Sequence, residues 1–137
     1  MYLKKFFIGA ILYASIELLW RGRTHWTMAV LGGVVYVILN DINIRIPNAS
    51  ITVKSVFGSG IITVLELICG VILNLKLGLK VWNYENIGYN ILGQICPKYT
   101  VYWFMLCIVA FILIELRDKL HQSLKNNKQE QTSKVIR

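Results

Sequence analysis

Long apolar runs and short polar stretches alternate along the chain. Four apolar runs can be delimited, at about residues 3–20, 26–42, 56–75 and 100–117. A helix that crosses a bilayer needs about 20 predominantly apolar residues, within a range of about 17–25. The pattern therefore predicts an all-α protein, a four-helix transmembrane bundle that forms one domain over residues 1–117.

A segment of different character, residues 82–98, separates the third run from the fourth. Its aromatic residues alternate with Asn, Gln, two glycines and Pro97, so it resembles neither a charged loop nor a regular helix. Tyr and Trp prefer the membrane–water boundary, where the ring is buried and the polar edge stays wet. We therefore expect this aromatic–amide segment to be an interfacial or re-entrant segment at one membrane face, before the last helix.

The composition places the chain in the membrane class. Of its 137 residues, 55% are hydrophobic and 16% are charged, whereas an ordinary soluble domain carries about 25% charged residues. A water-soluble domain of this size could not bury so much apolar surface, but lipid can cover it. We infer an integral membrane protein in contact with membrane lipids. The remaining residues, 118–137, form a polar, basic tail that we expect to be disordered.

The net charge of +8 does not indicate nucleic-acid binding. The basic residues lie at the ends of the apolar runs and in the tail, not along one face. With four spans both termini lie on one side of the membrane, and that side carries the larger share of Lys and Arg. The positive-inside rule then predicts a multi-pass protein of the cell membrane with both termini in the cytoplasm.

The sequence contains no motif for nucleotide binding, metal binding or nucleophilic catalysis. It has no G-x-x-x-x-G-K-[ST] loop, so this chain is not expected to bind ATP, and it has no G-x-S-x-G or H-E-x-x-H motif. Its three cysteines, Cys69, Cys96 and Cys107, stand far apart and indicate neither a metal site nor a disulfide framework. We therefore predict no catalytic residue, metal site or cofactor.

Two acidic residues inside apolar runs, Glu17 and Glu66, give the strongest chemical signal. An ionised acid at the centre of a membrane helix costs about 2.5–3.5 kcal/mol on insertion scales, so it is retained where it is paired, protonated or in contact with water. Glu17 lies about one turn before the end of the first run, and Glu66 lies ten residues before Lys76. Because the first and third helices run in the same direction, both acids are expected in the same half of the membrane.

The same half of the membrane is expected to hold polar and aromatic residues from the helix ends and from the aromatic–amide segment. The candidates for a polar cluster or ligand site are Glu17, Arg21, His25, Trp26, Glu66, Asn74, Trp82, Tyr84 and Asn90. A structural interpretation stays open beside this one, because acids can also clasp helices through hydrogen bonds. His25 can serve as a helix cap, and the aromatic residues can serve as membrane anchors. Glu115 and Asp41 are interpreted as solvated charges.

Several motifs occur in the order that is typical of a known family. They are Arg-Gly-Arg-Thr-His-Trp-Thr-Met at 21–28, Gly32-Gly33, Glu66 with Gly70, Trp82-Asn83-Tyr84, Asn90-Ile-Leu-Gly-Gln-Ile-Cys96 and Trp103. On these motifs the chain resembles, over nearly its whole length, the ABC-transporter type IV (CmpB-like) family of small multi-pass membrane proteins. The resemblance implies a permease-like protein. Asn83 and Glu85 depart from it, since they stand where the family usually has Asp and Ser.

Three hypotheses for the function follow from these features. In the first, the chain is a transporter or permease-like component in which a homo-oligomer or a partner membrane subunit completes a polar path. In the second, it is a non-transporting accessory or scaffold subunit of a membrane complex. In the third, it is a membrane-embedded enzyme that modifies a lipid.

Overall fold

The computed structural model describes the backbone of residues 1–135 and the side chains of residues 1–132. Within this range the chain forms four α-helices, and a six-residue π-helix, η1, continues the third. The elements are α1 (Tyr2–Arg21), α2 (Trp26–Arg45), α3 (Ile51–Gly70), η1 (Val71–Lys76) and α4 (Pro97–Val135). The predicted all-α fold is confirmed.

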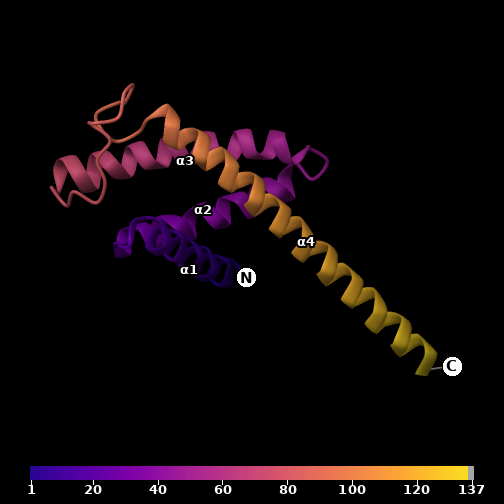
Figure 1. The fold of residues 1–137 in the computed structure, drawn as a ribbon. Helices are drawn as coiled ribbons and strands as arrows, with labels where there is room; N and C mark the ends of the chain where they lie inside the picture. Colours follow the sequence, from indigo (N-terminus) through magenta and orange to yellow (C-terminus); the bar gives the residue numbers. More distant parts are fainter. Residues whose placement is uncertain (136–137) are drawn as a thin grey trace.

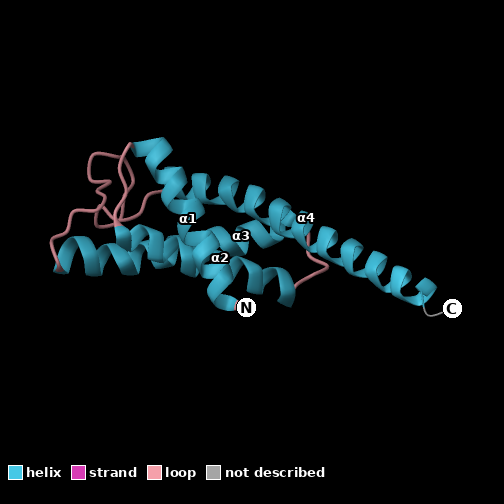
Figure 2. Ribbon diagram, turned by 90° about the horizontal axis from the view of Figure 1, so that it is seen from below, coloured by secondary structure: helices cyan, strands magenta, loops and turns pink. Residues whose placement is uncertain are grey.

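Successive helices run in opposite directions, so the bundle has two different ends (Figure 1). One end carries the N-terminus, the turn between α2 and α3, and the extension of α4 toward the C-terminus. The other end carries the turn between α1 and α2 and the loops that lead from η1 to α4 (Figures 1 and 2). We call these the terminal end and the loop end. α1 and α3 therefore run in the same direction.

Three of the described helices are long and apolar enough to cross a membrane. They are Trp26–Arg45, Ile51–Lys76 and Pro97–Thr132, and they make this chain a membrane protein. α1 does not qualify by composition, because its 20 residues include Lys4, Lys5 and Glu17. It packs along α2, however, and so lies at the same depth in the bundle as a helix that does qualify.

The helix bounds differ from the predicted ones at both ends of the bundle. α2 continues to Arg45 and α3 begins at Ile51, where the Ser50 hydroxyl accepts a hydrogen bond from the Val53 N–H at 3.3 Å. The turn between α2 and α3, residues 46–50, is therefore shorter than the polar stretch between the second and third apolar runs. α4 begins three residues earlier than expected, with Pro97 in its first turn, where a proline costs no hydrogen bond.

The tail also differs from its prediction as a disordered segment. α4 continues without a break to Val135, and the last two residues, 136 and 137, lie outside the described part of the chain. A helix is costly to nucleate but easy to extend, and the residues after 117 are mostly Lys, Gln, Leu and Asn, with neither Gly nor Pro. The apolar part of α4 supplies the nucleus from which these residues continue.

Two clusters of buried apolar side chains form the core. At the loop end the buried residues are Met28, Val81, Trp82, Tyr84 and Cys96. Toward the terminal end they are Leu39, Ile62, Cys107, Phe111 and Ile114. α2, α3 and α4 share the second cluster, whereas α1 stands on the outside of α2. No Cα atom of α1 lies within 8 Å of one in the described part of α4.

The close contact between α1 and α2 depends on small residues. A Cβ atom at Gly32 would overlap the Cβ of Tyr13 on α1, and one at Gly33 would come within 2.7 Å of the Phe6 ring. Backbones that approach this closely are typical of glycine-containing contacts between membrane helices. Glycine at these two positions therefore fixes α1 to α2.

We predict that Gly32→Ala lowers stability by about 1–3 kcal/mol, because the added methyl group overpacks against Tyr13. Gly60→Ala on α3 is the matched control, since a Cβ there meets no atom within 4 Å. We expect that change to be neutral or to stabilise the helix by up to about 1 kcal/mol. Denaturant-induced unfolding in detergent micelles, followed by circular dichroism, measures both. Equal effects of the two substitutions would show that this contact is not tight.

Candidate functional site

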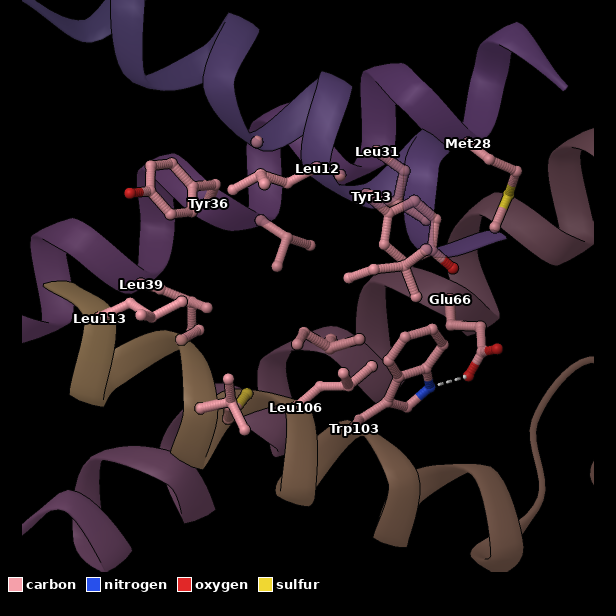
Figure 3. A pocket seen from close by; sticks show the side chains of 18 residues that line it. Leu12, Tyr13, Met28, Leu31, Tyr36, Leu39, Glu66, Trp103, Leu106 and Leu113 are labelled. Atoms are coloured by element: carbon pink, nitrogen blue, oxygen red, sulfur yellow. Dashed lines mark hydrogen bonds between the residues drawn. The ribbon is translucent and has the colours of Figure 1, made fainter. Parts of the chain in front are cut away.

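Glu66 is buried in α3 at the loop end, with 2% of its surface exposed. One carboxylate oxygen, Oε1, accepts a hydrogen bond from the Tyr84 hydroxyl at 2.7 Å. The other, Oε2, accepts one from the indole N–H of Trp103 at 2.9 Å (Figure 3). The aromatic–amide segment and α4 are thus both attached to the same acid on α3.

Glu17 is also buried, but its partners are different. Its Oε1 pairs with the Arg21 guanidinium at 2.7 Å, and its Oε2 accepts a hydrogen bond from the Thr24 hydroxyl at 2.6 Å. Arg21 also donates to the Val81 carbonyl at 2.7 Å, which ties α1 to the loops of the same end. Gly22, at φ 66°, ends α1 in the left-handed conformation and lets the chain turn back toward Thr24.

The two acids therefore lie at the same end of the bundle, but their charges are compensated differently. Glu17 has a cationic partner in Arg21. Among the described residues, Glu66 has neutral donors only, from Tyr84 and Trp103. In a membrane interior such a charge is costly unless hydrogen bonds or a bound cation compensate it. The cluster has room for one further positive charge.

A cleft separates α1 from α4 and reaches Glu66. A cavity of about 280 Å³ lies between the two helices, and α2 and α3 form its deep wall. In Figure 3, α1 passes above this cavity and α4 below it, and the Tyr13 hydroxyl points toward Glu66. An adjoining cavity of about 340 Å³ shares Tyr13, Trp103 and Leu106 with the first and extends to Glu17 and Arg21. We call the two together the α1–α4 cleft.

Tyr84 lies in the loop, outside the helices, and lines the second cavity. Burial above all, and then the neighbouring Glu66 carboxylate, raises the pKa of its hydroxyl well above the usual value for tyrosine. The hydroxyl therefore stays protonated and acts as a donor to Glu66 at any physiological pH. Its ring stacks on Tyr99 of α4 with the ring centroids 4.4 Å apart, which fixes the direction of that hydrogen bond.

Three further candidates hold the loop in place without reaching into the cleft's apolar part. The Asn74 amide donates to Gln94 Oε1 at 2.8 Å, and its oxygen accepts from the Val81 N–H at 2.7 Å. The indole of Trp82 donates to the Gln94 carbonyl at 3.0 Å. Asn90 bonds within its own turn, where its oxygen accepts from the Gly93 N–H at 2.9 Å. Asn74 and Asn90 support the site, and Trp82 also lines the second cavity.

Two candidates lie apart from the cleft. The imidazole Nδ1 of His25 accepts from the Thr27 N–H at 3.4 Å and so caps α2. Trp26, which stacks near His25, is 70% exposed on the outside of the bundle. Their positions fit the structural interpretation, a helix cap and a membrane anchor.

The sequence analysis missed a second polar cluster, at the terminal end. Lys54, with 1% of its surface exposed, donates from Nζ to Glu115 Oε1 at 2.8 Å, to Asn43 Oδ1 at 2.8 Å and to the Pro47 carbonyl at 3.3 Å. The interpretation of Glu115 as a solvated charge was wrong, because it pairs with this buried lysine. The usable signal was that Lys54 lies just before the third apolar run and Glu115 lies near the end of the fourth, so antiparallel packing of these runs places the two residues at the same end.

The same cluster extends along α4 to Arg117. Its guanidinium donates to Asn40 Oδ1 and to Asp118 Oδ1, both at 2.8 Å. Asn43 in turn donates to Asp118 at 3.3 Å. α2, α3 and α4 are thus joined at the terminal end by ion pairs and hydrogen bonds, and the charges there are compensated.

Comparison with known proteins agrees with this architecture. The profile of a family described as "putative ABC-transporter type IV" matches residues 5–136, which is nearly the whole chain. The chain belongs to this family. No curated protein and no solved structure matches the chain. The description of the ABC-transporter type IV family names transport.

One departure from the usual residues of the family has a simple structural account. Asn83 stands where the family usually has Asp, and its Oδ1 accepts a hydrogen bond from the Glu85 N–H at 2.8 Å. An aspartate oxygen would accept the same bond, because Asn and Asp form this turn in the same way. The substitution therefore preserves the turn that leads into Tyr84.

We predict that Lys54→Met lowers stability by about 3 kcal/mol, because it breaks a buried ion pair. This value is at the lower end of the usual range, since Glu115 keeps some contact with solvent. The double variant Lys54→Met/Glu115→Leu should recover much of this loss, since no unpaired charge remains. Lys76→Met, at an exposed lysine, is the control. Unfolding in detergent micelles measures all three. A double variant less stable than Lys54→Met would contradict the expected coupling.

Proposed function

We propose that the protein is the membrane-embedded substrate-binding component of a transporter, and that its substrate site is the α1–α4 cleft with Glu66 at the polar end. The observation that carries the proposal is the position of Glu66, a buried carboxylate with neutral donors only that lines an open cavity. Membership of a family named for ABC transport supports the same conclusion.

The cleft distinguishes this site from a purely structural clasp. Protein interiors are packed nearly as densely as organic crystals, and voids larger than a water molecule are few. An acid whose role was only to join helices would be enclosed by its partners. Glu66 is bonded to Tyr84 and Trp103, and it also lines a cavity of about 280 Å³.

Transport by this chain requires partners. The apolar cluster around Leu39, Ile62 and Phe111 separates the polar clusters of the two ends, so one copy offers no continuous polar path. The sequence lacks a phosphate-binding loop, so a second chain must hydrolyse ATP. We therefore propose a complex in the cell membrane that contains a second copy or another membrane subunit, together with an ATPase. The distribution of Lys and Arg favours termini in the cytoplasm.

A scaffold role is the second candidate, and one observation favours it. Both oxygens of Glu66 already have donors in this structure, as a clasp between α3, α4 and the loop would require. The two roles differ in their need for charge. A clasp needs a side chain at position 66 that can form hydrogen bonds with Tyr84 and Trp103, whether or not it is charged. A substrate site for a cation needs the ionised carboxylate.

We predict that Glu66→Gln leaves assembly intact and reduces ATP hydrolysis by the transporter complex at least about tenfold. Glutamine keeps the size, and its oxygen can accept from Trp103 while its amide donates to the Tyr84 hydroxyl, but the substitution removes the charge. The complex is purified from its native membranes in mild detergent and assayed in proteoliposomes. Glu85→Gln is the control, since it makes the same change on an exposed side chain of the same loop. A silent Glu66→Gln together with a Glu66→Leu variant that fails to assemble would replace the transport proposal by the scaffold role.

A further inference from the structure

The α1–α4 cleft changes character along its length. The cavity toward the terminal end has almost entirely apolar walls, including Leu12, Leu39, Leu106 and Leu113 (Figure 3). The adjoining cavity toward the loop end is surrounded by aromatic rings and by Glu17 and Arg21. A ligand that fits both parts has one apolar and one polar end. Ligand sites commonly measure about 300–1,000 Å³, so cavities of about 280 and 340 Å³ suit a single-chain molecule.

The mouth of the cleft faces lipid. α1 and α4 are neighbours across it without close backbone contact in the described residues. The apolar side chains that flank the opening, such as Leu12 on α1 and Val109 on α4, remain about half exposed. In a bilayer these positions would lie against hydrocarbon. A molecule already dissolved in the membrane can therefore enter sideways, with its chain between the two helices.

The charges at the polar end select the headgroup. With both acids ionised, Glu17 and Glu66 contribute two negative charges and Arg21 one positive charge. Both terminal nitrogens of Arg21 are already engaged, one with Glu17 and the other with the Val81 carbonyl. The excess is one negative charge, which attracts a cation and repels an anionic headgroup.

Aromatic rings around the same place favour a cation as well. Trp20, Tyr99, Tyr102 and Trp103 all line the cavity that contains Glu17 and Arg21. A ligand ammonium group over the face of a Trp or Tyr ring is attracted by the electrons of the ring, most strongly when the group is desolvated. Aromatic residues thus line the cavity next to Glu66, which lines the first cavity and is bonded to Trp103, a residue that both cavities share.

We infer that the α1–α4 cleft binds a single-chain amphiphile with a positively charged amine headgroup, which reaches the site from the lipid phase. The amine lies near Glu66 and the ring faces, and the chain lies along α4 toward Leu113. This inference rests on the proposed function, because it names the class of substrate for the same site.

Quenching of tryptophan fluorescence tests the inference directly, because Trp20, Trp82 and Trp103 line the cleft. The protein is placed in phosphatidylcholine nanodiscs and titrated with a long-chain alkyl amine, alcohol and carboxylic acid that carry the same nitroxide on the chain. We expect saturable quenching by the amine, competed by the unlabelled amine, with an affinity at least about tenfold higher than that of the alcohol. The carboxylic acid should bind weakest.

Two variants test whether the affinity for the amine depends on the charge of Glu66. Glu66→Gln should reduce the affinity for the amine about tenfold and leave that for the alcohol unchanged, whereas Glu85→Gln should change neither. Equal affinities for amine and alcohol, or tighter binding of the acid, would overturn the headgroup inference while the cleft remained a binding site. If no probe quenches saturably, the cleft is not a binding site, and the proposed function fails with it.

Discussion

The architecture at the loop end depends on the need of one buried carboxylate for hydrogen bonds. Hydrocarbon provides no water to satisfy the oxygens of Glu66, so the protein itself must supply the donors. It does so from two elements, with Tyr84 from the aromatic–amide segment and Trp103 from α4. Since both bonds converge on one residue of α3, an irregular loop and the start of α4 are fixed relative to the same helix.

The loop that supplies Tyr84 is stable without regular structure because its polar groups are satisfied locally. Asn74 at the end of η1 binds both the Val81 N–H and the Gln94 side chain, and Trp82 binds the Gln94 carbonyl. Arg21 adds a bond from α1 to the Val81 carbonyl. α1 is thus held by its glycine contact with α2 and by this loop, whereas it meets α4 through side chains such as the rings of Tyr13 and Trp103, whose centroids are 5.9 Å apart. That difference leaves the α1–α4 cleft open toward lipid.

The features that could be predicted from the sequence are those that depend on the spacing of residues along one stretch of the chain. The apolar runs predicted four helices, and their alternating directions placed Glu17 and Glu66 at one end. What the sequence did not predict depends on the register of distant segments. Lys54 and Glu115 are 61 residues apart, and only the register in which α3 packs against α4 brings them together. The Tyr84 and Trp103 donors likewise require the packed positions of the loop and α4.

The two ends of the bundle differ in a way that bears on transport. At the terminal end, Lys54 is fully buried and joined to Glu115 and Asn43, so the cations and anions there are matched. At the loop end, two carboxylates and one guanidinium line the open cleft. Opening the terminal end would separate a buried ion pair, which is costly, whereas widening the cleft would separate ring contacts between α1 and α4, such as Tyr13 with Trp103, and no ion pair among the described residues. For a transporter built on this chain, displacement of α1 is therefore the less costly first movement, and the ion pair at the terminal end keeps the opposite face closed while it occurs.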